Sequence, residues 1–123
     1  MPTVLVIDDD AQLRKLLRSV LQSAGYQVSE ACDGREGVQA VQFHPPDLVL
    51  CDIFMGEQDG LVTILKLRRE FPTLKVIAMS GGGALVPASF LDEARIFGAV
   101  ATLSKPFSPD TLLATVRRVL GPA

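Results

Sequence analysis

Leu48-Val49-Leu50-Cys51-Asp52 is a short apolar run that ends in a carboxylate. A continuous apolar run of this length is typical of a strand buried on both faces, as at the centre of a parallel sheet. Three other runs have the same form: residues 4–7 lead into Asp8, residues 76–79 into Ser80, and residues 100–103 through Ser104 into Lys105. The repeated pattern predicts parallel strands whose polar ends meet at one edge of a sheet, where open α/β sheets bind ligands.

Amphipathic helices are predicted between these strands. Residues 11–24 carry apolar side chains at helical spacing, and their buried stripe is expected to comprise Leu13, Leu16, Leu17, Val20, Leu21 and Ala24. Asp10 is the expected cap of this helix. Further helices are expected at 35–43, 59–70, 89–97 and 109–120, with a weak strand at 26–31 and a loop at 54–58. Five alternating strands and helices predict an α/β fold, a doubly wound five-stranded parallel sheet with helices on both faces.

The bulk properties narrow the function. A chain of 123 residues has the length of one domain, so we expect a single module at 1–123 without a DNA-binding output module. The net charge of −2 gives no basic footprint for nucleic acid. No signal peptide and no apolar stretch of eighteen residues is found, so we expect no membrane partner and a cytoplasmic location. Cys32 and Cys51 are expected to be reduced thiols.

The strand-end residues predict a charged pocket. Carboxylates about 4 Å apart repel by roughly 4 kcal/mol at an effective dielectric near 20, so Asp8, Asp9 and Asp52 are expected to share a cation. Oxygen ligands suit Mg²⁺, and Lys105 adds a second positive charge. A carboxylate held beside a metal ion and an ammonium group can attack a phosphoryl group and form an aspartyl phosphate.

Five segments resemble the receiver domain of two-component response regulators. They are residues 4–10 (Val-Leu-Val-Ile-Asp-Asp-Asp), residues 47–52 (Asp-Leu-Val-Leu-Cys-Asp), residues 55–60 from Met55 to Asp59-Gly60, Met79-Ser80-Gly81 and Lys105-Pro106-Phe107. The likeness covers essentially the whole chain and is that of a single-domain receiver. It implies a flavodoxin-like sheet of order 2-1-3-4-5.

The resemblance also implies the role of each site residue. Asp52 is the phosphoacceptor, and it binds Mg²⁺ directly together with Asp9 and the backbone carbonyl of Phe54. Asp8 binds the ion largely through water. Ser80 is the switch hydroxyl that turns toward the phosphoryl group. Lys105 pairs with a phosphoryl oxygen, and the Lys105-Pro106 bond is expected to be cis.

The resemblance further implies a signalling switch and not a turnover enzyme. The phosphoryl donor is a sensor histidine kinase or histidine phosphotransfer protein, which is expected to dock near the first helix beside Arg14 and Arg18. Phosphorylation would then change binding to a downstream protein target. The alternative is a Mg²⁺-dependent phosphatase of the haloacid dehalogenase type, because Asp8 and Asp10 have the Asp-x-Asp spacing of that class. That alternative leaves Asp52 without a role and the chain without room for a cap domain.

Two positions depart from the usual receiver pattern. Thr102 stands where receivers often carry Tyr or Phe, so the usual aromatic coupling to the switch hydroxyl is not expected. Gly81-Gly82-Gly83 opens a stretch that is a few residues longer than usual. We expect this stretch to form a mobile loop whose ordering responds to phosphorylation.

Overall fold

The computed structural model describes residues 1–55, 58–80, 95 and 97–121. Its helices and strands are β1 (Thr3–Ile7), α1 (Ala11–Ser23), β2 (Gln27–Ala31), α2 (Gly34–Phe43), β3 (Leu48–Asp52), β4 (Phe54–Met55), β5 (Gln58–Asp59), α3 (Gly60–Glu70), β6 (Lys75–Ser80), β7 (Ala101–Ser104) and α5 (Pro109–Leu120). The expected glycine-rich loop lies outside the described residues. So does the expected helix at 89–97, apart from Arg95 and Phe97.

One parallel sheet forms the middle layer of the molecule. Its strand order is β2-β1-β3-β6-β7, which is the expected order 2-1-3-4-5 when these five strands are counted along the chain. Val4 pairs with Leu48 between β1 and β3, and Leu48 pairs with Lys75 between β3 and β6. The apolar run at 48–52 is therefore the central strand, as predicted, and all five of its residues are buried.

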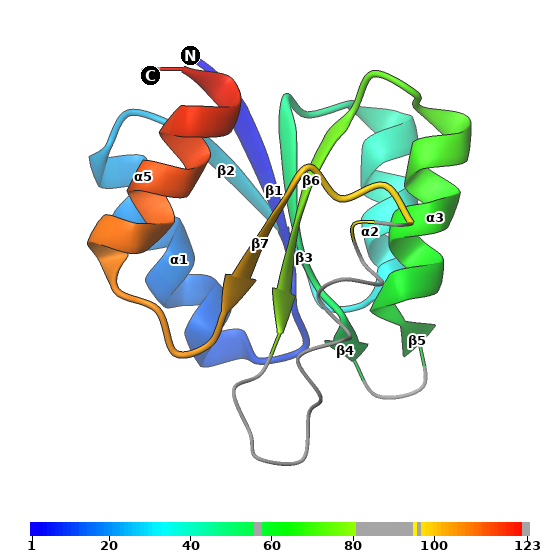
Figure 1. Cartoon of the computed structure of the whole chain (residues 1–123), viewed down its shortest axis with the longest axis horizontal. Helices are drawn as coiled ribbons and strands as arrows, with labels where there is room; N and C mark the ends of the chain where they lie inside the picture. Colours follow the sequence, from blue (N-terminus) through cyan, green and yellow to red (C-terminus); the bar gives the residue numbers. More distant parts are fainter. Residues whose placement is uncertain (56–57, 81–94, 96, 122–123) are drawn as a thin grey trace.

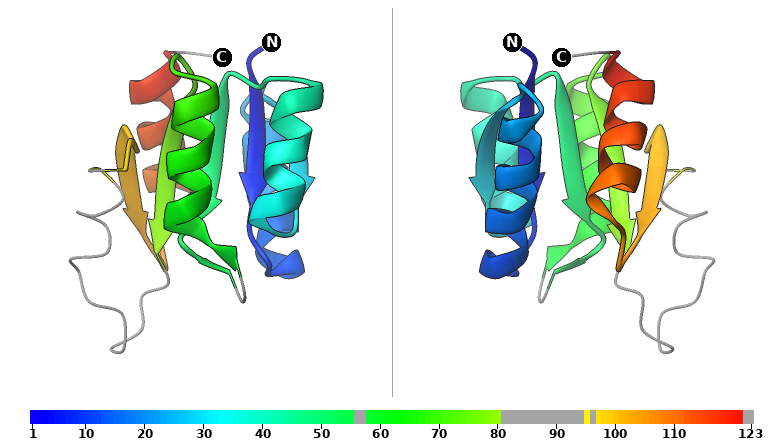
Figure 2. Two further views of the ribbon diagram at one scale, coloured as in Figure 1. Left: turned by 90° about the vertical axis from the view of Figure 1, so that its right-hand side faces the viewer. Right: turned by 90° about the vertical axis from the view of Figure 1, so that its left-hand side faces the viewer.

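Helices cover both faces of this sheet. Figures 1 and 2 show α1 and α5 on one face and α2 and α3 on the other. Successive strand side chains point to opposite faces, and the buried core accordingly divides into two clusters. The α1/α5 cluster includes Val4, Val6, Leu48, Leu50, Leu17, Leu21, Leu112 and Val116. The α2/α3 cluster includes Leu5, Ile7, Val49, Cys51, Val38, Val41, Ile64 and Leu67.

Side-chain caps start three of the described helices. The Asp10 carboxylate accepts hydrogen bonds from the backbone N–H groups of Gln12 and Leu13 at 3.0 and 3.2 Å, which confirms its expected role. Asp33 caps α2 in the same way, and Ser108 caps α5 ahead of Pro109. No helix among the described residues is both long enough and apolar enough to cross a membrane.

Three local predictions are wrong. Leu16 is 57% exposed instead of lying on the buried stripe, because it faces the margin between α1 and the segment after β7. The described residues of 54–58 are not loop: Phe54 and Met55 pair antiparallel with Asp59 and Gln58, and short strands of two residues carry no periodicity that would predict them. Val100 is 49% exposed and precedes β7, which starts one residue later than expected.

Candidate functional site

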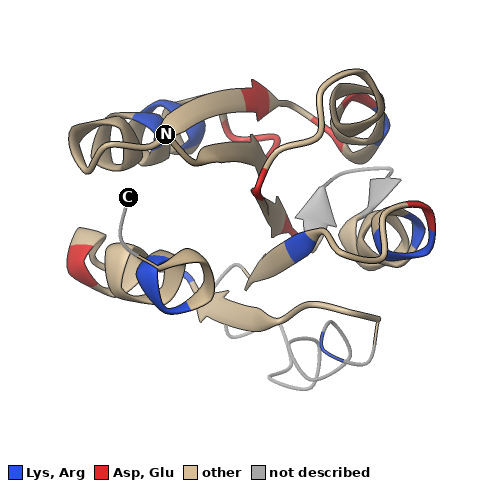
Figure 3. Cartoon of the chain, turned by 90° about the horizontal axis from the view of Figure 1, so that it is seen from above, with Lys and Arg blue, Asp and Glu red and all other residues tan. Residues whose placement is uncertain are grey.

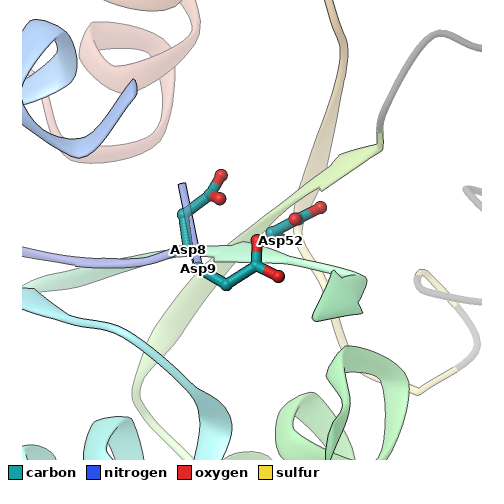
Figure 4. Close-up of side chains that lie close together, drawn as sticks. All are labelled: Asp8, Asp9 and Asp52. Carbon is teal, nitrogen blue, oxygen red and sulfur yellow. The ribbon is translucent and has the colours of Figure 1, made fainter. Parts of the chain in front are cut away.

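The predicted residues meet at the carboxyl-terminal edge of the sheet. Asp8 and Asp9 follow β1, Asp52 ends β3, Ser80 ends β6 and Lys105 follows β7. One oxygen from each of Asp8, Asp9 and Asp52 lies within 4.8 Å of the others, and Figure 4 shows the three side chains together. Figure 3 shows most other charged residues on helices, whereas acidic positions also occupy the centre between the helix layers.

Lys105 joins the two buried carboxylates. Its ammonium nitrogen lies 2.6 Å from Oδ2 of Asp8 and 3.5 Å from Oδ2 of Asp52. Asp8 is completely buried, and Asp52 is only 4% exposed. The backbone N–H of Lys105 donates to the carbonyl oxygen of Ser80 at 2.7 Å, so the lysine is joined to the end of β6. The Lys105-Pro106 bond is cis, as expected.

The charge of this cluster suits a divalent cation. Three carboxylates and one ammonium group carry a formal charge of −2 (three negative charges and one positive). Carboxylates this close repel one another unless a cation offsets the repulsion. Carboxylate and carbonyl oxygens are hard ligands, and Mg²⁺ binds one or two carboxylates while it keeps several waters. The residues present therefore fit Mg²⁺.

Asp10 does not belong to this cluster. The group of clustered acids comprises Asp8, Asp9 and Asp52, whereas the Asp10 side chain accepts hydrogen bonds from the first turn of α1. An Asp-x-Asp nucleophile pair needs both acids at the reacting centre. The haloacid dehalogenase alternative, which pairs Asp8 with Asp10, therefore finds no support in the structure.

Gly60 was overlooked as a site residue. A Cβ atom at this position would lie 2.2 Å from the carbonyl oxygen of Asp52 and 2.4 Å from the Cα of Ile53, so only glycine allows α3 to start against the end of β3. The N–H of Gly60 donates to the carbonyl oxygen of Ile53 at 3.2 Å. In the sequence, the Asp59-Gly60 pair indicates the start of a helix and forms part of the receiver resemblance, but its contact with the Asp52 backbone is tertiary and is not visible there.

An ion-pair network beside the cluster was also overlooked. Glu30 on β2 lies 3.2 Å from Nε of Arg14 and 2.7 Å from Nη1 of Arg18, both on α1. The hydrogen bond from Arg18, aided by Arg14, holds the pKa of Glu30 below its ordinary range. The two arginines beside which a donor is expected to dock are therefore already paired with Glu30. The Arg18 side chain is 43% exposed, whereas that of Arg14 is 18% exposed.

Comparison with known proteins agrees with this geometry. The family described as "Response regulator receiver domain" matches residues 4–117. The chain belongs to the response regulator receiver family. The chemotaxis protein CheY of Thermotoga maritima is 34% identical over 94% of this chain and 95% of its own length. The transcriptional regulatory protein ZraR of Escherichia coli is 35% identical over 95% of this chain, but the match spans only 26% of ZraR.

Solved receiver structures have the same fold. The chemotaxis protein CheY4 of Vibrio cholerae superposes with a TM-score of 0.88 at 30% identity, covering 97% of this receiver and 98% of that chain. Receiver domains are phosphoacceptor signalling switches of two-component systems, and they take phosphate from histidine kinases. The family uses Mg²⁺ at an acidic pocket, and the described residues of this chain include the acidic cluster of Asp8, Asp9 and Asp52.

Proposed function

We propose that this receiver accepts a phosphoryl group on Asp52. The observation that carries the proposal is the position of Asp52 beside both the other two acids and Lys105. Asp8 is less suited to attack, because its Oδ1 accepts from the N–H of Asp10 at 2.9 Å and its Oδ2 pairs with Lys105 at 2.6 Å. Asp9 is exposed at the rim, where an acyl phosphate would be open to water.

Mg²⁺ would be held by Asp9, Asp52 and the backbone carbonyl of Phe54, with Asp8 acting largely through water. Bound there, it would supply positive charge beside the phosphoryl oxygens. The oxygen-only character and the formal charge of −2 of the cluster support this assignment.

The chain's own residues carry out the transfer. A carboxylate oxygen of Asp52 attacks the phosphorus of a phosphohistidine, the P–N bond breaks, and the imidazole nitrogen that leaves takes up a proton. The Lys105 ammonium group, already 3.5 Å from Asp52, pairs with a phosphoryl oxygen. The Ser80 hydroxyl then donates to the phosphoryl group, which adds roughly −1.5 to −2 charges. If the phosphoryl group makes these contacts in only one of two conformations, it shifts the population toward that conformation and so changes the surface that binds a target protein.

An apolar groove beside the site is the proposed docking surface for the donor. It has a volume of about 330 Å³, it runs between α1 and the segment after β7, and it is lined mainly by Leu13, Leu16, Leu17, Val20, Phe107 and Leu112. Lys105 lies at this groove as well as in the acidic cluster. A donor helix with apolar side chains on the groove would therefore bring its phosphohistidine to Asp52. The exposure of Leu16 supports this assignment.

The test is incubation with acetyl phosphate and Mg²⁺ followed by intact mass measurement. Wild-type protein is expected to gain one phosphoryl group, and Asp52→Ala is expected to gain none. Asp10→Asn serves as the matched control, because Asn still caps a helix and Asp10 lies outside the cluster; it should gain the group like the wild type. Phosphorylation of Asp52→Ala to the wild-type extent would contradict the proposal.

A further inference from the structure

The Arg14 side chain joins three elements at the edge of the acidic cluster. From α1, its Nη1 donates to the backbone carbonyl oxygen of Asp8, after β1, at 2.7 Å. Its Nε lies 3.2 Å from Oε1 of Glu30 on β2. Only 18% of the Arg14 side chain is exposed. The planar guanidinium thus spans a backbone carbonyl and a carboxylate at once, which a flexible lysine does poorly.

These contacts hold the backbone on both sides of Asp9. On one side, Arg14 binds the carbonyl oxygen of the Asp8–Asp9 peptide. On the other side, the N–H of Asp10 donates to Oδ1 of Asp8 at 2.9 Å. The Asp9 carboxylate itself is exposed and makes no hydrogen bond or ion pair with any residue in the described part of the chain. Its direction toward Asp52 is therefore set by the backbone that carries it.

Glu30 pairs with Arg14 and also with Arg18, so the two arginines can be compared directly. Both arginines pair with the Glu30 carboxylate, Arg14 at Oε1 and Arg18 at Oε2. Only Arg14 also reaches the Asp8 carbonyl oxygen. The two side chains thus share a partner and a charge, and they differ in their contact with the peptide that precedes Asp9.

We propose that Arg14 is a positioning residue for the divalent-cation site, holding the Asp8–Asp9 peptide so that the Asp9 carboxylate faces Asp52. This inference rests on the proposed role of Asp8, Asp9 and Asp52 in binding Mg²⁺. Positioning and simple electrostatics predict opposite changes in Mg²⁺ affinity when Arg14 is replaced. A guanidinium group near a cation site repels the cation, so removing it should strengthen binding by charge alone. Loss of positioning should weaken binding instead.

The experiment measures Mg²⁺ affinity by calorimetric titration of the whole protein at constant ionic strength. Arg14→Met keeps most of the apolar stem and is expected to weaken Mg²⁺ binding about tenfold. This is the lower end of the loss in metal affinity seen when a residue that orients a metal ligand is replaced. Arg18→Met removes the same charge from the same Glu30 partner and is expected to stay within about twofold of wild type. Thermal unfolding in EDTA separates these effects from any loss of stability.

A second variant tests the geometry at constant charge. Arg14→Lys keeps the positive charge but cannot span the Asp8 carbonyl oxygen and Glu30 together, so its Mg²⁺ affinity is expected to fall about threefold. Wild-type affinity in both Arg14 variants, tighter binding by Arg14→Met, or an equal loss in Arg18→Met would overturn the inference. Absence of Mg²⁺ binding by the wild-type protein would instead refute the proposed function on which it rests.

Discussion

Asp9→Asn is expected to stabilise the protein without metal and to remove most of the stabilisation that Mg²⁺ provides. The Asp9 carboxylate is exposed, it makes no hydrogen bond to any described residue, and it lies within 4.8 Å of the carboxylates of Asp8 and Asp52. Its replacement by an amide therefore loses no favourable contact and relieves repulsion. The same replacement removes a charged ligand from the proposed cation site.

The magnitude follows from that spacing. Two unit charges 4.8 Å apart repel by roughly 0.9 kcal/mol in bulk water and roughly 3.5 kcal/mol at a dielectric of 20. The lower figure applies to Asp9 because it is exposed. Asp9 is repelled by two carboxylates, and its attraction to Lys105 offsets part of this repulsion. Asp9→Asn should therefore stabilise the metal-free protein by about 1–2 kcal/mol. For a domain of this size that is roughly 3–9 °C in Tm.

Urea unfolding followed by circular dichroism, in EDTA and in Mg²⁺, provides the assay. In EDTA the variant should unfold at higher urea than the wild type. Mg²⁺ at a hundred times its Kd should stabilise the wild type by about 2.7 kcal/mol, and the variant by less than about 1 kcal/mol. Asp10→Asn is the matched control, since it removes a neighbouring charge that lies outside the cluster; it should stay within about 0.5 kcal/mol of wild type in both buffers.

Two results would refute this reasoning. A lower stability of Asp9→Asn in EDTA would mean that the carboxylate makes a favourable contact and is not repelled. An equal Mg²⁺-dependent gain in variant and wild type would mean that Asp9 does not bind the ion.

Three further changes test other parts of the site. Lys105→Met should destabilise the metal-free protein by about 3 kcal/mol, since it leaves the buried Asp8 carboxylate without its ammonium partner; urea unfolding measures this, and Mg²⁺ should restore part of the loss. Glu30→Gln tests pH dependence. The folded-state pKa of Glu30 is lowered, so its ion pairs stabilise the folded protein above the ordinary glutamate pKa of about 4.3. This stabilisation is lost as the pH falls through the folded-state pKa. The difference in unfolding free energy between variant and wild type should therefore close in acid, and a constant difference would count against the ion pairs. Leu16→Ser should slow transfer from a histidine kinase donor and leave labelling by acetyl phosphate unchanged; equal slowing with both donors would argue against the groove as a docking surface.

The sequence was sufficient to predict the main sheet and the residues that meet at its carboxyl-terminal edge. The fully apolar run of β3 requires burial on both faces, and this requirement predicted its central place. Because parallel strands all run the same way, polar residues at their ends must meet at one edge, so the strand pattern alone places Asp8, Asp52, Ser80 and Lys105 together. The sequence also predicted the Asp10 cap, because capping involves only residues two and three positions further along the chain.

The contacts that position the site were decided only by the tertiary structure. Gly60 touches the Asp52 backbone, and Arg14 bridges the Asp8 carbonyl oxygen and Glu30, so each contact joins residues that belong to different segments of the chain. Exposure is another such property: Leu16 has the spacing of a core residue, yet it borders a groove beside α1. Periodicity and strand ends reflect local geometry and burial, which each segment encodes by itself. Which side chain reaches which carbonyl depends on how α1, β2 and α3 pack, and packing is a property of the whole fold.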